Sequence, residues 1–168
     1  MKFLSLGLVT ILLMSGCSRW GDYVHKSDRF GYKITFPVHW TVWDRSTDRE
    51  DHLDAEYPDI PGAQMTVLTS PTAPDIHPNE IYPTFMDGGG DTAILTEFEI
   101  LTKGAVSCKN REGRQITYTY LTEDQRIKGM RALFIGERFI FTIKVEMPSD
   151  VFVDHEPEFN KMLSMLEL

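Results

Sequence analysis

The residues best suited to hold a cation are concentrated between positions 44 and 59. The stretch carries seven carboxylates and one imidazole, from Asp44, Asp48, Glu50, Asp51, His52, Asp54, Glu56 and Asp59. Carboxylate oxygens suit Ca²⁺, and an imidazole extends the choice to transition metals. The spacing is not that of an EF-hand, and Arg45 and Arg49 partly neutralise the run. We therefore predict a solvated polar loop over residues 44–63. The alternative is a metal- or small-ligand site whose candidate ligands are Asp48, Glu50, Asp51 and His52.

No arrangement of groups in the sequence indicates catalysis. The five histidines are dispersed, and no two stand at zinc-site spacing. No Gly-x-Ser-x-Gly motif precedes a helix, and the run Gly88-Gly89-Gly90 lacks the Lys and Ser/Thr of a phosphate-binding loop. We therefore expect no enzyme activity. A hydrolase whose site is assembled from dispersed residues is the remaining enzymatic alternative.

Aromatic side chains in predicted strands form the second set of candidate binding residues. They are Trp40, Trp43, Tyr118 and Tyr120. Such residues can line an apolar groove for a ligand or partner. Packing in the core and on the faces of a sheet is the interpretation we favour, because large apolar side chains are usually buried.

Cys17 is the residue whose surroundings indicate a specific covalent chemistry. Lys2 is followed by twelve uncharged residues, and Ser15-Gly16 then precede the cysteine. That order is typical of a signal peptide, and the apolar run is shorter than the about 20 residues that a membrane-spanning helix needs. The segment Leu13-Met14-Ser15-Gly16-Cys17 resembles the lipobox of bacterial lipoproteins, with Met where Leu is usual. The resemblance implies cleavage before Cys17 and a diacylglyceryl thioether on its sulfur.

A lipid on Cys17 would define the boundaries and the location of the protein. We expect a signal peptide over residues 1–16, a lipidated tether over 17–22 and a single globular domain over 23–168. Two or three acyl chains make detachment very slow, because each buried methylene contributes about 0.8 kcal/mol. Ser18 is compatible with sorting to the outer membrane, so in a Gram-negative envelope we expect the domain to face the periplasm from that membrane.

Charge and cysteine content narrow the choice of partners. The chain carries 17 Lys and Arg against 25 Asp and Glu, a net charge of −8, and loss of Lys2 with the signal peptide gives −9. Such a surface repels nucleic acids, so we expect none as a partner. Cys108 has no partner once Cys17 is lipidated, so we expect a buried thiol and no disulfide. We expect no cofactor other than the covalent lipid.

Alternating apolar residues predict that the domain is mainly β-structure. The expected strands are residues 30–36, 40–43, 65–69, 92–101, 105–109 and 115–121. In the fourth of these strands, alternation places Ile94, Thr96, Phe98 and Ile100 on one face. A short helix is expected over Asn79 to Met86, with Pro83 limiting its length.

The clearest local pattern is a hairpin of residues 128–135 and 138–147. Gly136-Glu137 suits a two-residue type II′ turn, for which Gly stands first. That turn pairs Phe134 with Phe139 and Ala132 with Phe141, placing the apolar side chains of both strands on one face.

The C-terminal segment has the spacing of an amphipathic helix. Asp154 can cap its first turn, and Phe159, Met162, Leu163 and Leu166 recur on one face. With the strands, this predicts an α+β fold: a single antiparallel sheet of about 6–8 strands, with the C-terminal helix and one short helix packed on it.

The order of these elements resembles the PsbP-like domains, which include DcrB-type lipoproteins. At the N-terminal end, Phe30 to Trp40 gives an aromatic strand, a proline and then a tryptophan. At the C-terminal end, a long apolar hairpin closes on Pro148 and a final helix with Phe159 and Leu163. The resemblance covers nearly all of residues 23–168. It implies an antiparallel sheet with helices on its faces, a binding or assembly role with an envelope protein partner, and no shared enzyme activity.

Overall fold

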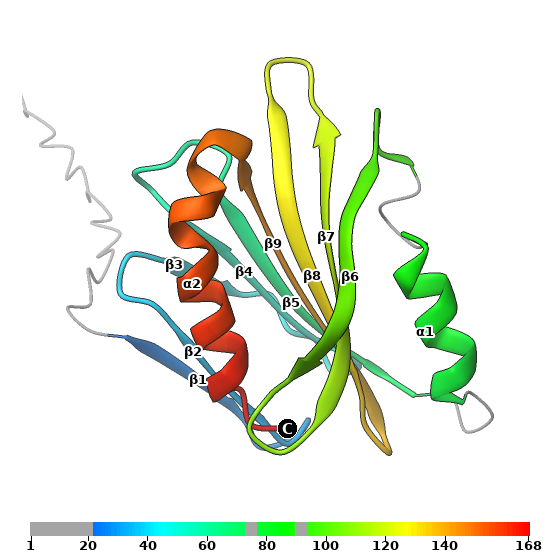
Figure 1. The fold of residues 1–168 in the computed structure, drawn as a ribbon. Helices are drawn as coiled ribbons and strands as arrows, with labels where there is room; N and C mark the ends of the chain where they lie inside the picture. The colour runs from blue at the N-terminus through cyan, green and yellow to red at the C-terminus, as the bar shows by residue number, and fades with distance from the viewer. Residues whose placement is uncertain (1–21, 73–76, 90–93) are drawn as a thin grey trace, which may run out of the picture.

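Seven strands form one antiparallel sheet in a computed structural model that describes residues 22–72, 77–89 and 94–168 (Figure 1). Their order across the sheet is β3-β4-β5-β9-β8-β7-β6. The strands are β3 (Thr41–Asp44), β4 (Asp51–Glu56), β5 (Gln64–Pro71), β6 (Glu99–Ser107), β7 (Glu112–Leu121), β8 (Arg126–Ile135) and β9 (Phe139–Pro148). The predicted α+β class and the predicted number of strands are confirmed.

Three further elements complete the layers on either side of this sheet. Strands β1 (Tyr23–Ser27) and β2 (Tyr32–Phe36) pair as a separate two-stranded sheet, which the sequence analysis did not anticipate. Helix α2 (Ser149–Met165) lies with them over one face, and helix α1 (Pro78–Met86) lies on the other side of the molecule (Figure 1). We call the face under α2 the inner face and the opposite face the outer face.

Each face of the sheet carries its own apolar core. The inner core joins β2, α2 and the inward side chains of β4, β5, β8 and β9, and Ile34, Phe36, Phe134 and Phe159 in it are fully buried. The outer core lies between α1 and strands β7 and β8, around Ile116 and Tyr118. Strand β8 is therefore buried on both faces, and its second half, Met130 to Ile135, is apolar except for Arg131.

The β8–β9 hairpin forms as predicted, but its register is shifted by two residues. Phe134 pairs with Phe141 and Ile135 with Ile140. The turn residues are Glu137-Arg138, closed by the Gly136 N–H, which donates to the Phe139 carbonyl at 2.8 Å. Gly136 does not have the positive φ of a type II′ turn, so the glycine misled the prediction. A shift of two residues keeps every side chain on its face, and the predicted apolar face is correct.

Strand β6 replaces the two separate strands that were expected over 92–101 and 105–109. It begins at Glu99 because Glu97, with φ of 51°, takes the left-handed conformation and turns the chain just before it. Ile94 is 87% exposed, so the predicted common face of Ile94, Thr96, Phe98 and Ile100 is wrong. The part of this prediction on residues 92–93 lies outside the described residues. Only Phe98 and Ile100 pack against the outer core.

The expected loop over residues 44–63 contains strand β4. Asp51, Leu53 and Ala55 point inward and are buried, whereas His52 and Asp54 lie on the outer face. The strand was not predicted because it has only two apolar side chains, Leu53 and Ala55, and both stand next to acidic residues. Pairing with β5 over its whole length stabilises it.

Helix α2 begins six residues earlier than predicted. It starts at Ser149 after Pro148, so Asp154 is not its N-cap and Pro157 lies inside the helix. Asp154 and the acidic residues after it suit the first turn of a helix, which is why the start was predicted there. Pro157 cannot donate to the Val153 carbonyl, and Val153 is 62% exposed, so water can reach that carbonyl. The predicted buried face of Phe159, Met162, Leu163 and Leu166 is confirmed.

Close packing of Gly129 in β8 gives a test of the central sheet. A Cβ atom at Gly129 would lie 2.6 Å from the Tyr118 ring, whereas one at Gly104 in β6 would meet nothing within 4 Å. We expect Gly129→Ala to lower the free energy of unfolding by about 1–3 kcal/mol, because the tyrosine must move. Gly104→Ala should leave stability unchanged or raise it by at most about 1 kcal/mol. Urea denaturation of both variants measures this, and equal stabilities would contradict the packing.

Candidate functional site

The acidic run does not come together as one site. Alternation along β4 sends Asp51 to the inner face and His52 to the outer face. Asp48 is fully exposed and lies 3.7 Å from Arg29, and His52 Nε2 lies 3.1 Å from Asp54. Within residues 22–72, 77–89 and 94–168, no group of three His, Cys, Asp or Glu side chains is placed to hold a metal ion.

Asp51 instead belongs to a buried polar cluster between the small sheet and the main sheet. His25 Nε2 lies 3.8 Å from Asp51 Oδ2, and the His25 ring lies 5.6 Å from the ring of Tyr32. Burial, followed by the charge of Asp51, raises the pKa of the Tyr32 hydroxyl well above its usual range. These groups, with Thr69, hold polar atoms inside the inner core. No sequence pattern indicates this cluster, because its members are distant along the chain.

The four candidate aromatics are divided between the two cores. Trp40 is buried in the inner core, where its ring packs edge-on against Tyr57 and Phe159. Tyr118 and Tyr120 stack on each other in the outer core, with ring centroids 6.3 Å apart. Trp43, at the β3 edge, is 41% exposed. The structure therefore does not bring these residues together in one groove.

A buried carboxylate, Glu146, anchors the outer core and was missed in the sequence. Its side chain is 3% exposed. The Tyr118 hydroxyl donates to Oε1 at 2.7 Å, and the Gln64 amide donates to Oε2 at 2.9 Å. Lys144 Nζ lies 3.3 Å from the same Oε2. Burial and the nearby Glu146 raise the pKa of Tyr120 to about 12. The surrounding donors compensate the charge, which indicates a structural network.

A hollow between α1 and the outer face is a candidate binding site. Its volume is about 430 Å³, within the range of small-ligand sites, and Ile81, Phe85, Leu133 and Ile140 supply apolar walls. Arg131 Nη1 donates to the Gly89 carbonyl at 3.0 Å, and its guanidinium lies 5.2 Å from the Phe85 ring. We call this hollow the α1 groove. The start of β1 lies on the opposite side of the molecule (Figure 1).

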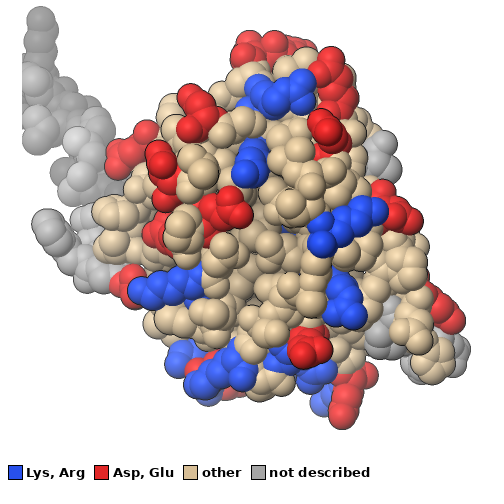
Figure 2. Space-filling model, in the orientation of Figure 1, with Lys and Arg blue, Asp and Glu red and all other residues tan. Residues whose placement is uncertain are grey.

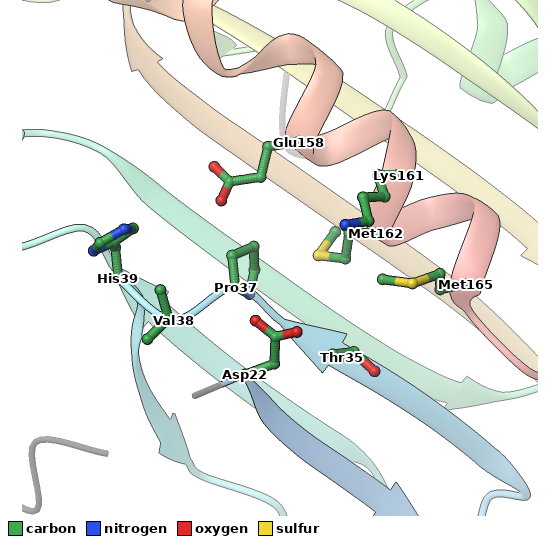
Figure 3. Close-up of a pocket in the computed structure, with 9 residues that line it drawn as sticks. All are labelled: Asp22, Thr35, Pro37, Val38, His39, Glu158, Lys161, Met162 and Met165. Atoms are coloured by element: carbon green, nitrogen blue, oxygen red, sulfur yellow. The ribbon is translucent and has the colours of Figure 1, made fainter. Parts of the chain in front are cut away.

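A smaller hollow of about 190 Å³ lies where the described chain begins. Figure 3 shows Lys161, Met162 and Met165 of α2 facing Pro37 and Val38 across it, with Asp22 alongside. Val38 is 41% exposed and Met165 40% exposed. This end of the domain therefore presents apolar side chains next to its N-terminal connection.

The structure describes only one of the two cysteines, Cys108. Cys108 is buried and forms no disulfide with a described residue, and its thiol lies 3.9 Å from Asn110 Oδ1. Cys17 lies outside the described residues. No helix in the described parts of the chain is both long enough and apolar enough to span a bilayer.

Comparison with known proteins identifies the fold. No protein-family model and no curated protein sequence matches the chain. Among solved structures, cyanobacterial PsbP (CyanoP) from Synechocystis sp. PCC 6803 superposes with a TM-score of 0.69 at 13% sequence identity, covering 91% of this chain and 95% of that one. The domain has a PsbP-like fold.

Two further structures share this PsbP-like architecture. PA94 of Pseudomonas aeruginosa, a protein of unknown function, is 8% identical with a TM-score of 0.56, covering 88% of this chain and 97% of its own. LpqN of Mycobacterium tuberculosis, involved in cell envelope biogenesis, is 12% identical with a TM-score of 0.56, covering 76% of this chain and 82% of its own. At these identities the likeness establishes the fold, and function must be argued from the chain's own residues.

The hydrogen bond from Tyr118 to the buried Glu146 predicts that loss of the tyrosine hydroxyl destabilises the fold. Tyr118→Phe removes the donor at 2.7 Å and leaves a buried carboxylate oxygen without it. We expect the free energy of unfolding to fall by about 1–3 kcal/mol. Tyr82→Phe is the matched control, because its ring packs under Arg114 at 5.1 Å and that contact survives loss of the hydroxyl. Calorimetry that found equal melting temperatures for the two variants would contradict the network.

Proposed function

We propose that the protein is a lipid-anchored envelope protein whose domain binds a protein partner without catalysing a reaction. The lipobox-like segment ending at Cys17 supports the anchor. The PsbP-like fold, shared with an envelope-biogenesis protein, supports a binding or assembly function. In a Gram-negative envelope, Ser18 favours the outer membrane, with the domain in the periplasm.

The observation that carries the proposal is the position of the α1 groove relative to the anchor. The tether joins the domain at Asp22, on the side opposite α1 (Figure 1). A domain held at Asp22 turns its exposed Val38 and Met165 toward the bilayer and its α1 groove away from it. The groove is then open to proteins in the compartment that the domain faces.

Metal or small-ligand binding by residues 44–59 was the alternative proposed from the sequence. Strand β4 places its candidate ligands on opposite faces, with Asp51 inside and His52 outside. No geometric feature of the described run favours this alternative over partner binding.

Replacing the anchor cysteine tests the first part of the proposal. Cys17→Ala should abolish incorporation of labelled palmitate and release the protein from the membrane fraction, or leave it held only by an uncleaved signal peptide. The matched control is Cys108→Ala, which should remain labelled because Cys108 is buried in the domain. Lipidation at Cys17 would be contradicted if Cys17→Ala were still labelled, or if the parent chain were not labelled.

A photo-reactive amino acid placed in the groove tests the second part. Thr142 lines the α1 groove, and Thr102 is exposed on β6, outside that groove. In cells, a probe at Thr142 should give a discrete cross-linked species, and a probe at Thr102 should not. Identical adducts from both positions would indicate unspecific contact and contradict a partner in the α1 groove.

A further inference from the structure

Three turns converge at one end of the domain and bring three arginines to one hollow. Arg29 comes from the β1–β2 turn, Arg111 from the β6–β7 turn and Arg138 from the β8–β9 turn. The hollow has a volume of about 300 Å³. We call it the arginine pocket. Figure 2 shows several basic side chains, interspersed with acidic ones, along the lower edge of a molecule whose net charge is −8.

Two phenylalanine rings hold the outer arginines in place. Phe30 and Phe139 pack edge to face, with centroids 5.0 Å apart. The guanidinium of Arg29 lies 5.1 Å from the Phe30 ring, and that of Arg138 lies 5.6 Å from the Phe139 ring. Each ring therefore orients one cation and also gives the pocket an apolar wall.

Arg111 is held differently and retains a buried donor. Its Nη1 donates to the Ile135 carbonyl at 3.0 Å, which fixes the side chain against β8. Its Nε is buried and makes no hydrogen bond to any described group. The guanidinium of Arg111 is therefore fixed at the pocket by a contact with the backbone and not by a carboxylate.

Direct ion pairs leave the arginines of this pocket largely unengaged. Among the described residues, neither Arg111 nor Arg138 has a carboxylate within ion-pair distance, and Arg29 has only the exposed Asp48 at 3.7 Å. Asp28 lines the pocket but pairs with Lys26 at 2.5 Å. Two further acidic groups line the pocket: Glu137, exposed in the β8–β9 turn, and the C-terminal carboxylate of Leu168, which accepts from the Asn110 side-chain amide.

We propose that the arginine pocket binds a phosphate ester whose organic part is apolar. A phosphate monoester carries nearly two negative charges and three terminal oxygens, and guanidinium groups bind such oxygens with paired N–H donors. A carboxylate, with one charge and two oxygens, would leave one arginine without a partner. The phenylalanine rings would contact the organic substituent. The pocket is separate from the α1 groove, so this binding does not depend on the proposed partner.

Calorimetric titration of the whole chain in detergent with phenyl phosphate tests this site. Arg138→Gln removes an exposed cation that has no hydrogen bond or ion pair in the described structure, so folding should be unaffected. We expect it to weaken binding roughly tenfold, the loss of one charge-assisted contact. Arg126→Gln is the matched control, because Arg126 pairs with Glu97 outside the pocket, and its affinity should be unchanged.

A second variant and a second probe complete the test. Glu137→Gln removes an acid from the lining and should tighten binding. Dihexanoyl phosphatidic acid, titrated in the same way, distinguishes a lipid phosphate from a soluble ester. Arg138-dependent binding of either probe supports the site and identifies the source. Absence of binding by both probes at millimolar concentration, or equal loss in Arg138→Gln and Arg126→Gln, would overturn it.

Discussion

Burial of strand β8 on both faces is the constraint on which the rest of the structure depends. This strand sends Met130 and Phe134 into the inner core and Leu133 and Ile135 into the outer core, and it pairs with β7 and β9 on its two sides. A polar group in these strands is then tolerated only with its partners, as for Glu146 beneath Tyr118 and Gln64. The two proposed binding sites accordingly lie beside the cores and not within them: the α1 groove next to the outer core, and the arginine pocket among the turns between strands.

The fold could be predicted from the sequence wherever local pattern and burial agree. Alternation in β8 and β9 reports the inner core directly, so their apolar face was found even with the register two residues out. Strand β4 could not be found this way, because Leu53 and Ala55 owe their burial to neighbours supplied by β5. Asp154 shows the opposite error, since a local signal for a helix start is overridden once Phe152 packs into the inner core.

The candidate sites were less predictable than the fold, because they are assembled from distant segments. The acidic run looked like a site because its members are close in sequence, yet strand alternation separates Asp51 from His52. The sequence did not predict a site at Arg29, Arg111 and Arg138, because each lies alone in its own turn. In the structure, the three turns lie at a common end of the domain. Proximity along the chain and proximity in space differ strongly in an antiparallel sheet, where alternate hairpin turns, such as β6–β7 and β8–β9, lie at the same end.

Strand β6 carries a bulge where its pairing with β7 shifts register between Ile100 and Thr102. This bulge affects how copies of the protein can approach one another. Both edges of the sheet expose backbone groups, but β3 is only four residues long, whereas β6 has nine. A continuous nine-residue edge invites end-to-end polymerisation through added strands. The register shift between Ile100 and Thr102 interrupts the ladder of β6. Such a bulge twists an edge away from a flat approach, so a dense layer of these domains on a surface would resist fusing into fibres.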